Sequence, residues 1–156
     1  MTSLKTRLFH IYARVRRPMT LGVRAIVEDA DGRVLLVRHT YVKGWHLPGG
    51  GVERGEPCLE ALRRELIEEG GVILRNNARL TGVYSNHASF RNDHVLVYHV
   101  PADSWDPGTP TAWGEIAEIS WFTMEDLPDT TTQGTRQRLA EFGGAPVKVH
   151  WASIPS

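Results

Sequence analysis

The chain has 156 residues, which is enough for one domain with its own hydrophobic core and argues against several. Lysine and arginine together number 18, and so do aspartate and glutamate, so the net charge gives no reason to expect nucleic acid, an anionic membrane or a basic partner. The single cysteine, Cys58, cannot form an internal disulfide, and no apolar run is long enough for a transmembrane helix. We therefore expect a cytoplasmic protein in which any electrostatic effect is local.

The first segment, residues 3–17, carries apolar side chains at helical spacing with basic side chains between them, and Pro18 follows. This pattern predicts a basic amphipathic helix within residues 1–18 that belongs to the same folding unit as the rest. Its apolar face could pack on the core or on a second subunit of a homodimer, lie on an anionic membrane, or remain a flexible extension. We favour packing on the core or in a dimer over membrane contact.

The second segment contains two β-branched apolar runs, residues 21–29 and 33–40, with "ADG" between them. This arrangement predicts a hairpin from Leu21 to Arg38. The sequence "HTYVKGWHLPGGG" then reads as a loop, and Pro57, apolar residues at helical spacing and a closing Gly70-Gly71 pair predict a helix over residues 57–69.

The remaining segments alternate between strand and helix patterns. Strands are predicted at residues 72–85, 94–102 and 117–123, a turn or short helix at 124–129, and a last helix at 131–142. The C-terminal tail, residues 143–156, carries an apolar alternation that could add an edge strand. This order predicts an α/β fold with a mixed β-sheet between helices.

The helix over residues 57–69 concentrates negative charge on one face. At 100° per residue, Glu65, Glu68 and Glu69 fall within an arc of about 100°, and each like-charge pair at this spacing costs roughly 0.2–0.5 kcal/mol. Arg63 and Arg64 are expected to project to other sides of the helix. A hard divalent cation would offset the repulsion, with magnesium as the natural candidate and manganese second; the alternative is an ordinary acidic surface.

The spacing of these residues resembles the Nudix box of the Nudix hydrolases in full. The matching positions are Gly50, Glu56, Arg64, Glu65, Leu66, Glu68, Glu69, Gly71 and Val72. The segments "RVLLVRHTYVKGWHLPGG" and "GEIAEISWFTMEDLP" are also similar to the family's pattern. The resemblance implies an α/β/α sandwich over residues 19–142 and the magnesium-dependent hydrolysis of a pyrophosphate bond in a nucleoside diphosphate linked to a further group.

The same resemblance implies roles for individual residues. The metal ligands would be the backbone carbonyl of Gly49 and the carboxylates of Glu65, Glu68 and Glu69. Arg64 would orient Glu65, and Glu56 would support the loop. In many members a further glutamate precedes the late strand and acts as the general base; we favour Glu115 over Glu118 for this position.

Residues that could bind the substrate are harder to identify. Gly50 and Gly51 let the backbone approach phosphates closely, and Arg38 and His39 could contact phosphates from the loop before the box. Trp45 could stack on a base, although an aromatic residue in a domain of this size is more often part of the core.

The substrate itself stays open, because residues 86–92 read "NHASFRN" and contain none of the markers associated with Nudix subfamilies. We expect a small nucleotide: a nucleotide sugar, ADP-ribose or a nucleoside triphosphate. One alternative is removal of pyrophosphate from RNA 5′ ends, which would want a basic channel. Another is a regulatory module that binds a nucleotide without catalysis. Neither DNA nor a membrane is expected as a partner.

Overall fold

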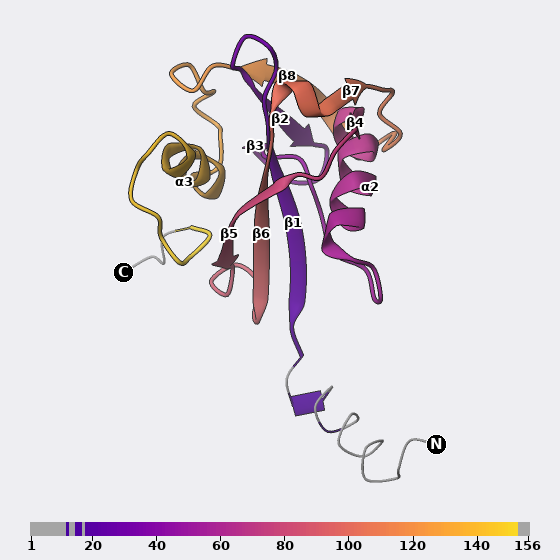
Figure 1. The fold of residues 1–156 in the computed structure, drawn as a ribbon. Helices are drawn as coiled ribbons and strands as arrows, with labels where there is room; N and C mark the ends of the chain where they lie inside the picture. Colours follow the sequence, from indigo (N-terminus) through magenta and orange to yellow (C-terminus); the bar gives the residue numbers. More distant parts are fainter. Residues whose placement is uncertain (1–11, 13–14, 17, 153–156) are drawn as a thin grey trace.

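The computed structural model describes residues 12, 15, 16 and 18–152 (Figure 1). The predicted N-terminal helix therefore lies almost entirely outside the described residues, as does the end of the predicted C-terminal tail. Within the described part of the chain, no helix combines the length and the apolar character that crossing a membrane requires.

Three small sheets form the centre of the molecule. The first has the order β1-β6-β5 and consists of β1 (Thr20–Val27), β6 (Asp93–Val100) and β5 (Arg79–Ser85). The second has the order β3-β2-β8 and consists of β3 (Trp45–His46), β2 (Val34–His39) and β8 (Ile116–Phe122). The third pairs β4 (Val72–Leu74) with β7 (Trp105–Pro107). β1 runs parallel to β6, whereas the other pairs are antiparallel, so the β-structure is mixed.

Two helices lie on opposite sides of these sheets, α2 (Cys58–Gly70) and α3 (Gln133–Phe142), as Figure 1 shows. The short helix η1 (Ala102–Ser104) precedes β7. The predicted α/β/α sandwich is confirmed. Helix α2 is displaced by one residue from its predicted range and ends as expected at Gly71, whose φ of 62° is left-handed and whose N–H donates to the carbonyl of Ile67.

The core has one layer on each side of the sheets. Beneath α2, Val23 and Val27 of β1 and Leu35 of β2 pack against Leu62 and Leu66. The opposite faces of the same strands contribute to a second cluster, which also contains Leu139 of α3. Its strand residues include Ile26, Val34 and Leu36. Because successive side chains of a strand point to opposite faces, β1 and β2 are buried on both sides, which explains their continuous apolar runs.

The predicted hairpin is wrong, although both of its strands exist. β1 pairs with β6 over its whole length, and β2 pairs with β8. The link between β1 and β2 consists of a tight turn and one antiparallel bridge between Glu28 and Val34. Each strand is buried on both faces and pairs with a strand that is distant in the sequence. A turn pattern between neighbouring residues contains no information about such a partner.

Three further details differ from expectation. The predicted strand 72–85 is two strands, because the chain bends at Arg75 and Asn76 and β4 and β5 join different sheets. The short strands β3 and β7 were not predicted. In the described part of the C-terminal tail there is one parallel bridge, between Ser85 and His150, and no extended edge strand.

Candidate active site

A glycine loop, residues 48–52, lies along the edge of β1 that β6 does not occupy. Ala25 donates its N–H to the carbonyl of Pro48, and Val23 donates to that of Gly50, at 3.0 and 2.9 Å respectively. Val52 N–H in turn donates to the carbonyl of Leu21 at 2.9 Å. These bonds fix the backbone of the loop opposite the acidic face of α2, so the loop and the helix form the two walls of one site.

Glu69 connects these two walls directly. Its side chain is only 9% exposed, and its Oε2 accepts the backbone N–H of Gly49 at 2.8 Å. Its Oε1 lies 3.5 Å from Nε2 of His39, which is also buried. Burial, with the charges of Glu65 and Glu115 adding to it, raises the pKa of Glu69 to about 7. The carboxylate is therefore held out of water, and the charge of Arg24 and the N–H of Gly49 offset only part of the cost.

Arg64 is the centre of an ion-pair network on the same face. It donates from Nε to Glu56 at 3.0 Å, from Nη1 to Glu65 at 2.7 Å, and from Nη1 to Glu68 at 3.4 Å. The expectation that Arg64 projects away from the acids is wrong, since its long side chain folds back along the helix. Arg63 does turn away, toward the carbonyl of Leu74.

Glu65 lies between this network and the glycine loop. Its carboxyl group packs so closely on Gly50 that a Cβ at that glycine would lie 2.5 Å from the carboxyl carbon. The side chain is 12% exposed, and burial raises its pKa against the opposing effect of Arg64. A residue with a side chain at position 50 would displace Glu65. The position of the Glu65 carboxyl group therefore requires glycine at position 50.

Arg24 contacts the glycine loop, and the sequence analysis missed it. It projects from β1 and donates from Nη1 to the carbonyls of Leu47 and Gly49. Burial, with the charges of Arg24 and His46 adding to it, lowers the pKa of His39 to about 4. The Gly49 carbonyl, which was predicted to bind a metal, accepts a hydrogen bond from Arg24 in this structure. The available signal was a single arginine inside the apolar run "LGVRAIV".

The two candidates for the general base are placed differently. Glu118 forms an ion pair with Arg38, with 2.7 Å between Oε2 and Nη2, so its charge is already compensated. Glu115 is exposed and close enough to Glu69 for its charge to contribute to the raised pKa of that residue. Among the described residues Glu115 forms no ion pair, so it is the candidate near Glu69 whose charge is not already paired.

Two cavities flank the site. One, of about 270 Å³, is lined by Gly50, Gly51 and Arg24 together with residues of β1 and β6. The other, of about 640 Å³, is lined by Arg38, His39 and Trp45. Trp45 is 7% exposed and packs edge-on against Phe122 at 5.0 Å between ring centroids, so it belongs mainly to the core. Tyr41, which the sequence analysis passed over, is the exposed aromatic ring in this second cavity.

The donor chemistry of the acidic wall suits a hard divalent cation. Glu65, Glu68 and Glu69 offer carboxylate oxygens, which are the ligands that such a cation prefers. Burial raises the pKa of Glu65 and Glu69, so a cation bound beside them would stabilise their charged forms. Within the described residues, however, no three His, Cys, Asp or Glu side chains converge as a ready-made site. The guanidinium of Arg64 bridges Glu65 and Glu68 instead, so the carboxylates would have to rotate to share a metal.

Comparison with known proteins identifies relatives that match most of the chain. The NUDIX domain family model matches residues 18–142. A Bacillus subtilis (strain 168) protein provisionally named 8-oxo-dGTP diphosphatase is 32% identical over 124 residues, 79% of each chain. An RNA pyrophosphohydrolase of Sodalis glossinidius (strain morsitans) is 30% identical over 124 residues, 79% of this chain and 65% of that protein. The crystal structure of a MutT NUDIX hydrolase from Burkholderia pseudomallei has a TM-score of 0.66 and 29% identity, covering 78% of this chain and 95% of that one.

Proposed function

This chain belongs to the NUDIX domain family, and on that premise we propose that it is a magnesium-dependent enzyme that hydrolyses the pyrophosphate bond of a nucleoside diphosphate linked to a further group. The observation that carries this proposal is a pair of carboxylates held against the glycine loop with raised pKa values, Glu69, which is buried, and Glu65, which is partly buried. Their burial destabilises the free protein, and a bound cation would offset that cost.

Each residue of the site would have a distinct role. Glu65, Glu68 and Glu69 would hold the cation, which when bound neutralises charge on the diphosphate and lowers the pKa of the attacking water. Arg64 positions Glu65 and Glu68 through its ion pairs, and Glu56 holds Arg64 in turn. The backbone of Gly50 and Gly51 lines the cavity next to these acids and leaves room for phosphate groups.

Bond breaking requires one water molecule and one proton acceptor. The water oxygen forms a bond to one phosphorus atom, the bond from that phosphorus to the bridging oxygen breaks, and the bridging oxygen leaves with the other phosphate. Glu115 would accept the proton of the water, since the competing acid Glu118 is paired with Arg38.

A substrate panel tests this function. We expect turnover with magnesium on at least one of a set of nucleotide sugars, ADP-ribose and nucleoside triphosphates. Replacing Glu115 with glutamine should lower kcat by at least about tenfold, since a general base typically contributes 10²–10⁴-fold. The matched control is Glu125→Gln, an exposed acid that lines neither cavity. Nucleotide binding without any turnover would instead favour the regulatory module.

Magnesium should also stabilise the folded protein. A ligand that binds only the native state adds about 2.7 kcal/mol when its concentration is a hundred times its dissociation constant, so millimolar magnesium should raise the melting temperature measured by calorimetry. Glu65→Gln should reduce this increase, whereas Glu125→Gln should not. An identical melting temperature with magnesium and with a chelator would contradict the proposed metal site.

The cytoplasmic location and the homodimer remain predictions. The proposed substrate is a nucleotide, in agreement with the names of the relatives described above.

A further inference from the structure

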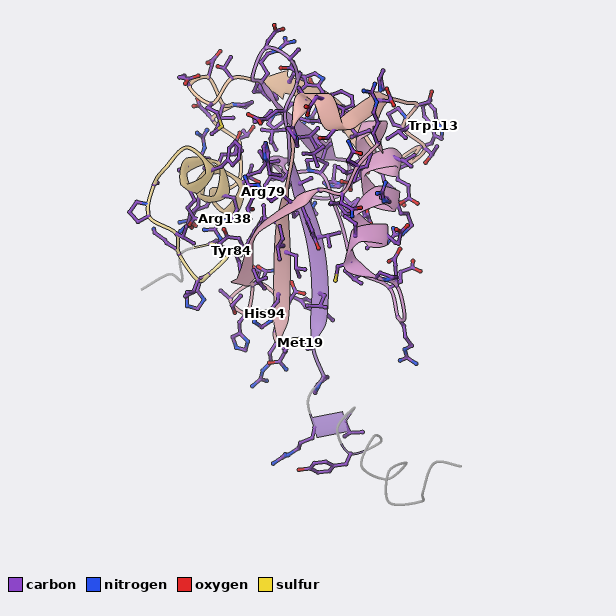
Figure 2. All side chains as sticks on the ribbon, in the orientation of Figure 1. Met19, Arg79, Tyr84, His94, Trp113 and Arg138 are labelled. Atoms are coloured by element: carbon purple, nitrogen blue, oxygen red, sulfur yellow. The ribbon has the colours of Figure 1, made fainter. Side chains whose placement is uncertain are left out.

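Three neighbouring cavities, linked by shared lining residues, lead away from the glycine loop, and together we call them the trough. The first is the cavity of about 270 Å³ beside Gly50 and Gly51. It shares Thr20 and Phe90 with a second cavity of about 510 Å³. The second shares Met19 and Asn92, among others, with a third of about 340 Å³. Met19 and His94, which both line the third cavity, lie at the end of the molecule where β1 and β6 begin (Figure 2).

The charges along this trough are almost all positive. Its lining includes Arg24 in the first cavity, Arg54 and Arg91 in the second, and Arg16 in the third. Among the described lining residues the single carboxylate is that of Asp93. It already accepts hydrogen bonds from the hydroxyl of Thr20 and the amide of Asn86, at 2.7 and 2.8 Å. Local charge separation therefore exists in a protein with equal numbers of acids and bases.

The second cavity beside the site carries less unpaired positive charge than the trough. In the cavity of about 640 Å³, Arg38 is neutralised by its ion pair with Glu118, which leaves Lys43 as the one lysine or arginine of that lining without an ion pair to a described residue. In the trough, neither Arg54 nor Arg91 forms an ion pair with another described residue. Two unpaired guanidinium groups on one rim form the kind of surface that recognises several phosphate groups in a row.

An exposed aromatic ring lies between the positive charges. Phe90 is 60% exposed, precedes Arg91 in the sequence, and lines both the first and the second cavity. Proteins that bind single-stranded nucleic acid combine a positively charged groove with aromatic side chains on which bases stack. Phe90 has the position of such a ring, at the boundary between the cavity next to the acids and the part of the trough that carries Arg54 and Arg91.

We propose that this trough holds the nucleotides that follow the first one in an RNA chain, so that the enzyme acts on the 5′ end of RNA. The proposal rests on the pyrophosphohydrolase function proposed above and names its substrate class. RNA chains start with a nucleoside triphosphate, so their 5′ ends carry the pyrophosphate bond that the acidic wall would hydrolyse. Water adds across that bond, leaving a 5′-monophosphate on the RNA and releasing pyrophosphate. Arg54 and Arg91 contact the phosphates of the following nucleotides, and Phe90 stacks on a base.

The dependence of turnover on chain length tests the proposal. The substrates are ATP and 5′-triphosphorylated RNAs of two, four and eight nucleotides that all begin with adenosine, so the first nucleotide is constant. We expect kcat/KM to rise with length and to be at least tenfold higher for the octamer than for ATP at low salt. The difference should shrink as salt increases, because phosphate contacts with arginine release counterions.

Charge-reversal variants assign this dependence to the trough. Arg54→Glu and Arg91→Glu should each lower the ratio of kcat/KM for octamer and ATP at least fivefold and flatten its salt dependence. The matched control is Arg75→Glu, which makes the same charge change at an exposed ion pair with Asp106 and should keep the wild-type ratio. Phe90→Ala should lower the ratio without flattening the salt dependence, because stacking carries no counterion term. Melting temperatures confirm that each variant is folded.

Several outcomes would overturn the proposal. Turnover of ATP with no increase along the RNA series would remove RNA as the substrate class while leaving the pyrophosphohydrolase function intact. If Arg54→Glu and Arg91→Glu kept the length dependence of the wild type, as Arg75→Glu is expected to do, the trough would be ruled out as the binding surface. Inactivity on ATP and on every RNA would remove this inference, and the pyrophosphohydrolase function would fall with it only if the nucleotide sugars and ADP-ribose were also left intact.

Discussion

Glu69→Gln should lower kcat by roughly a hundredfold or more, a loss of about 2.7 kcal/mol of transition-state stabilisation. The variant keeps the size of the side chain and an oxygen that can accept the N–H of Gly49, so the contact between α2 and the glycine loop can survive. What it loses is one anionic oxygen ligand. The measurement is steady-state turnover with magnesium on whichever substrate the wild-type protein prefers.

The same variant should gain stability when no metal is present. The folded-state pKa of Glu69 is raised from 4.5 to about 7 by burial, so ionising this group opposes folding. The penalty is absent below pH 4.5, grows between pH 4.5 and 7, and is complete above pH 7, where it amounts to as much as about 3 kcal/mol. Glu69→Gln should therefore be more stable than the wild type at pH 8 in the presence of a chelator, and the difference should vanish as the pH falls below 4.5.

Denaturant unfolding of both proteins across this pH range measures the difference directly. The difference cancels the contributions of groups that do not contact this residue, whereas His39, 3.5 Å from the carboxylate and with its pKa lowered to about 4, contributes below the range in which Glu69 titrates. A Glu69→Gln protein that is less stable than the wild type at pH 8 and nearly normal in turnover would show that this acid has a structural role, and our assignment would be wrong.

Alanine at Gly49 and at Gly50 should separate stability from activity at adjacent positions. Gly49 has a φ of 137°, and a Cβ there would lie 2.0 Å from the carbonyl oxygen of Val23 and 2.9 Å from Cα of Arg24. Both are backbone atoms of β1, which cannot move without disturbing the sheet. The strained φ alone costs on the order of 1–3 kcal/mol, so with the clash we expect Gly49→Ala to lower the melting temperature by roughly 10 °C.

Gly50→Ala should give the opposite result. The three heavy atoms nearest to a Cβ at this position all belong to the carboxyl end of Glu65, which can rotate away, so the melting temperature should stay close to that of the wild type. Turnover should fall by about tenfold or more, because Glu65 would leave its place beside Arg64. Gly51→Ala, where a Cβ would have no neighbour within 4 Å, is the control for thermal stability. Equal melting temperatures for the variants at 49 and 50 would contradict this account.

Most of the local structure could be predicted from the sequence because it depends on near neighbours. Helix α2 follows from leucines at helical spacing and a glycine with a left-handed φ, both of which act within a few residues. The same spacing places Glu65, Glu68 and Glu69 on one face, so the acidic wall and its resemblance to the Nudix box are properties of the sequence alone. The sandwich of helices and mixed strands follows from the order of the elements.

The tertiary structure decided which strands pair and which charges are compensated. The turn between β1 and β2 indicated a hairpin, yet β1 pairs with β6 and β2 pairs with β8, segments more than seventy residues away in the sequence. Arg24 reaches the glycine loop from β1, a contact between residues 25 positions apart. The burial that raises the pKa of Glu69 likewise comes from the loop and β2 packing over α2. Pairing, burial and pKa depend on atoms brought together from distant segments, and a pattern of neighbouring residues does not contain them.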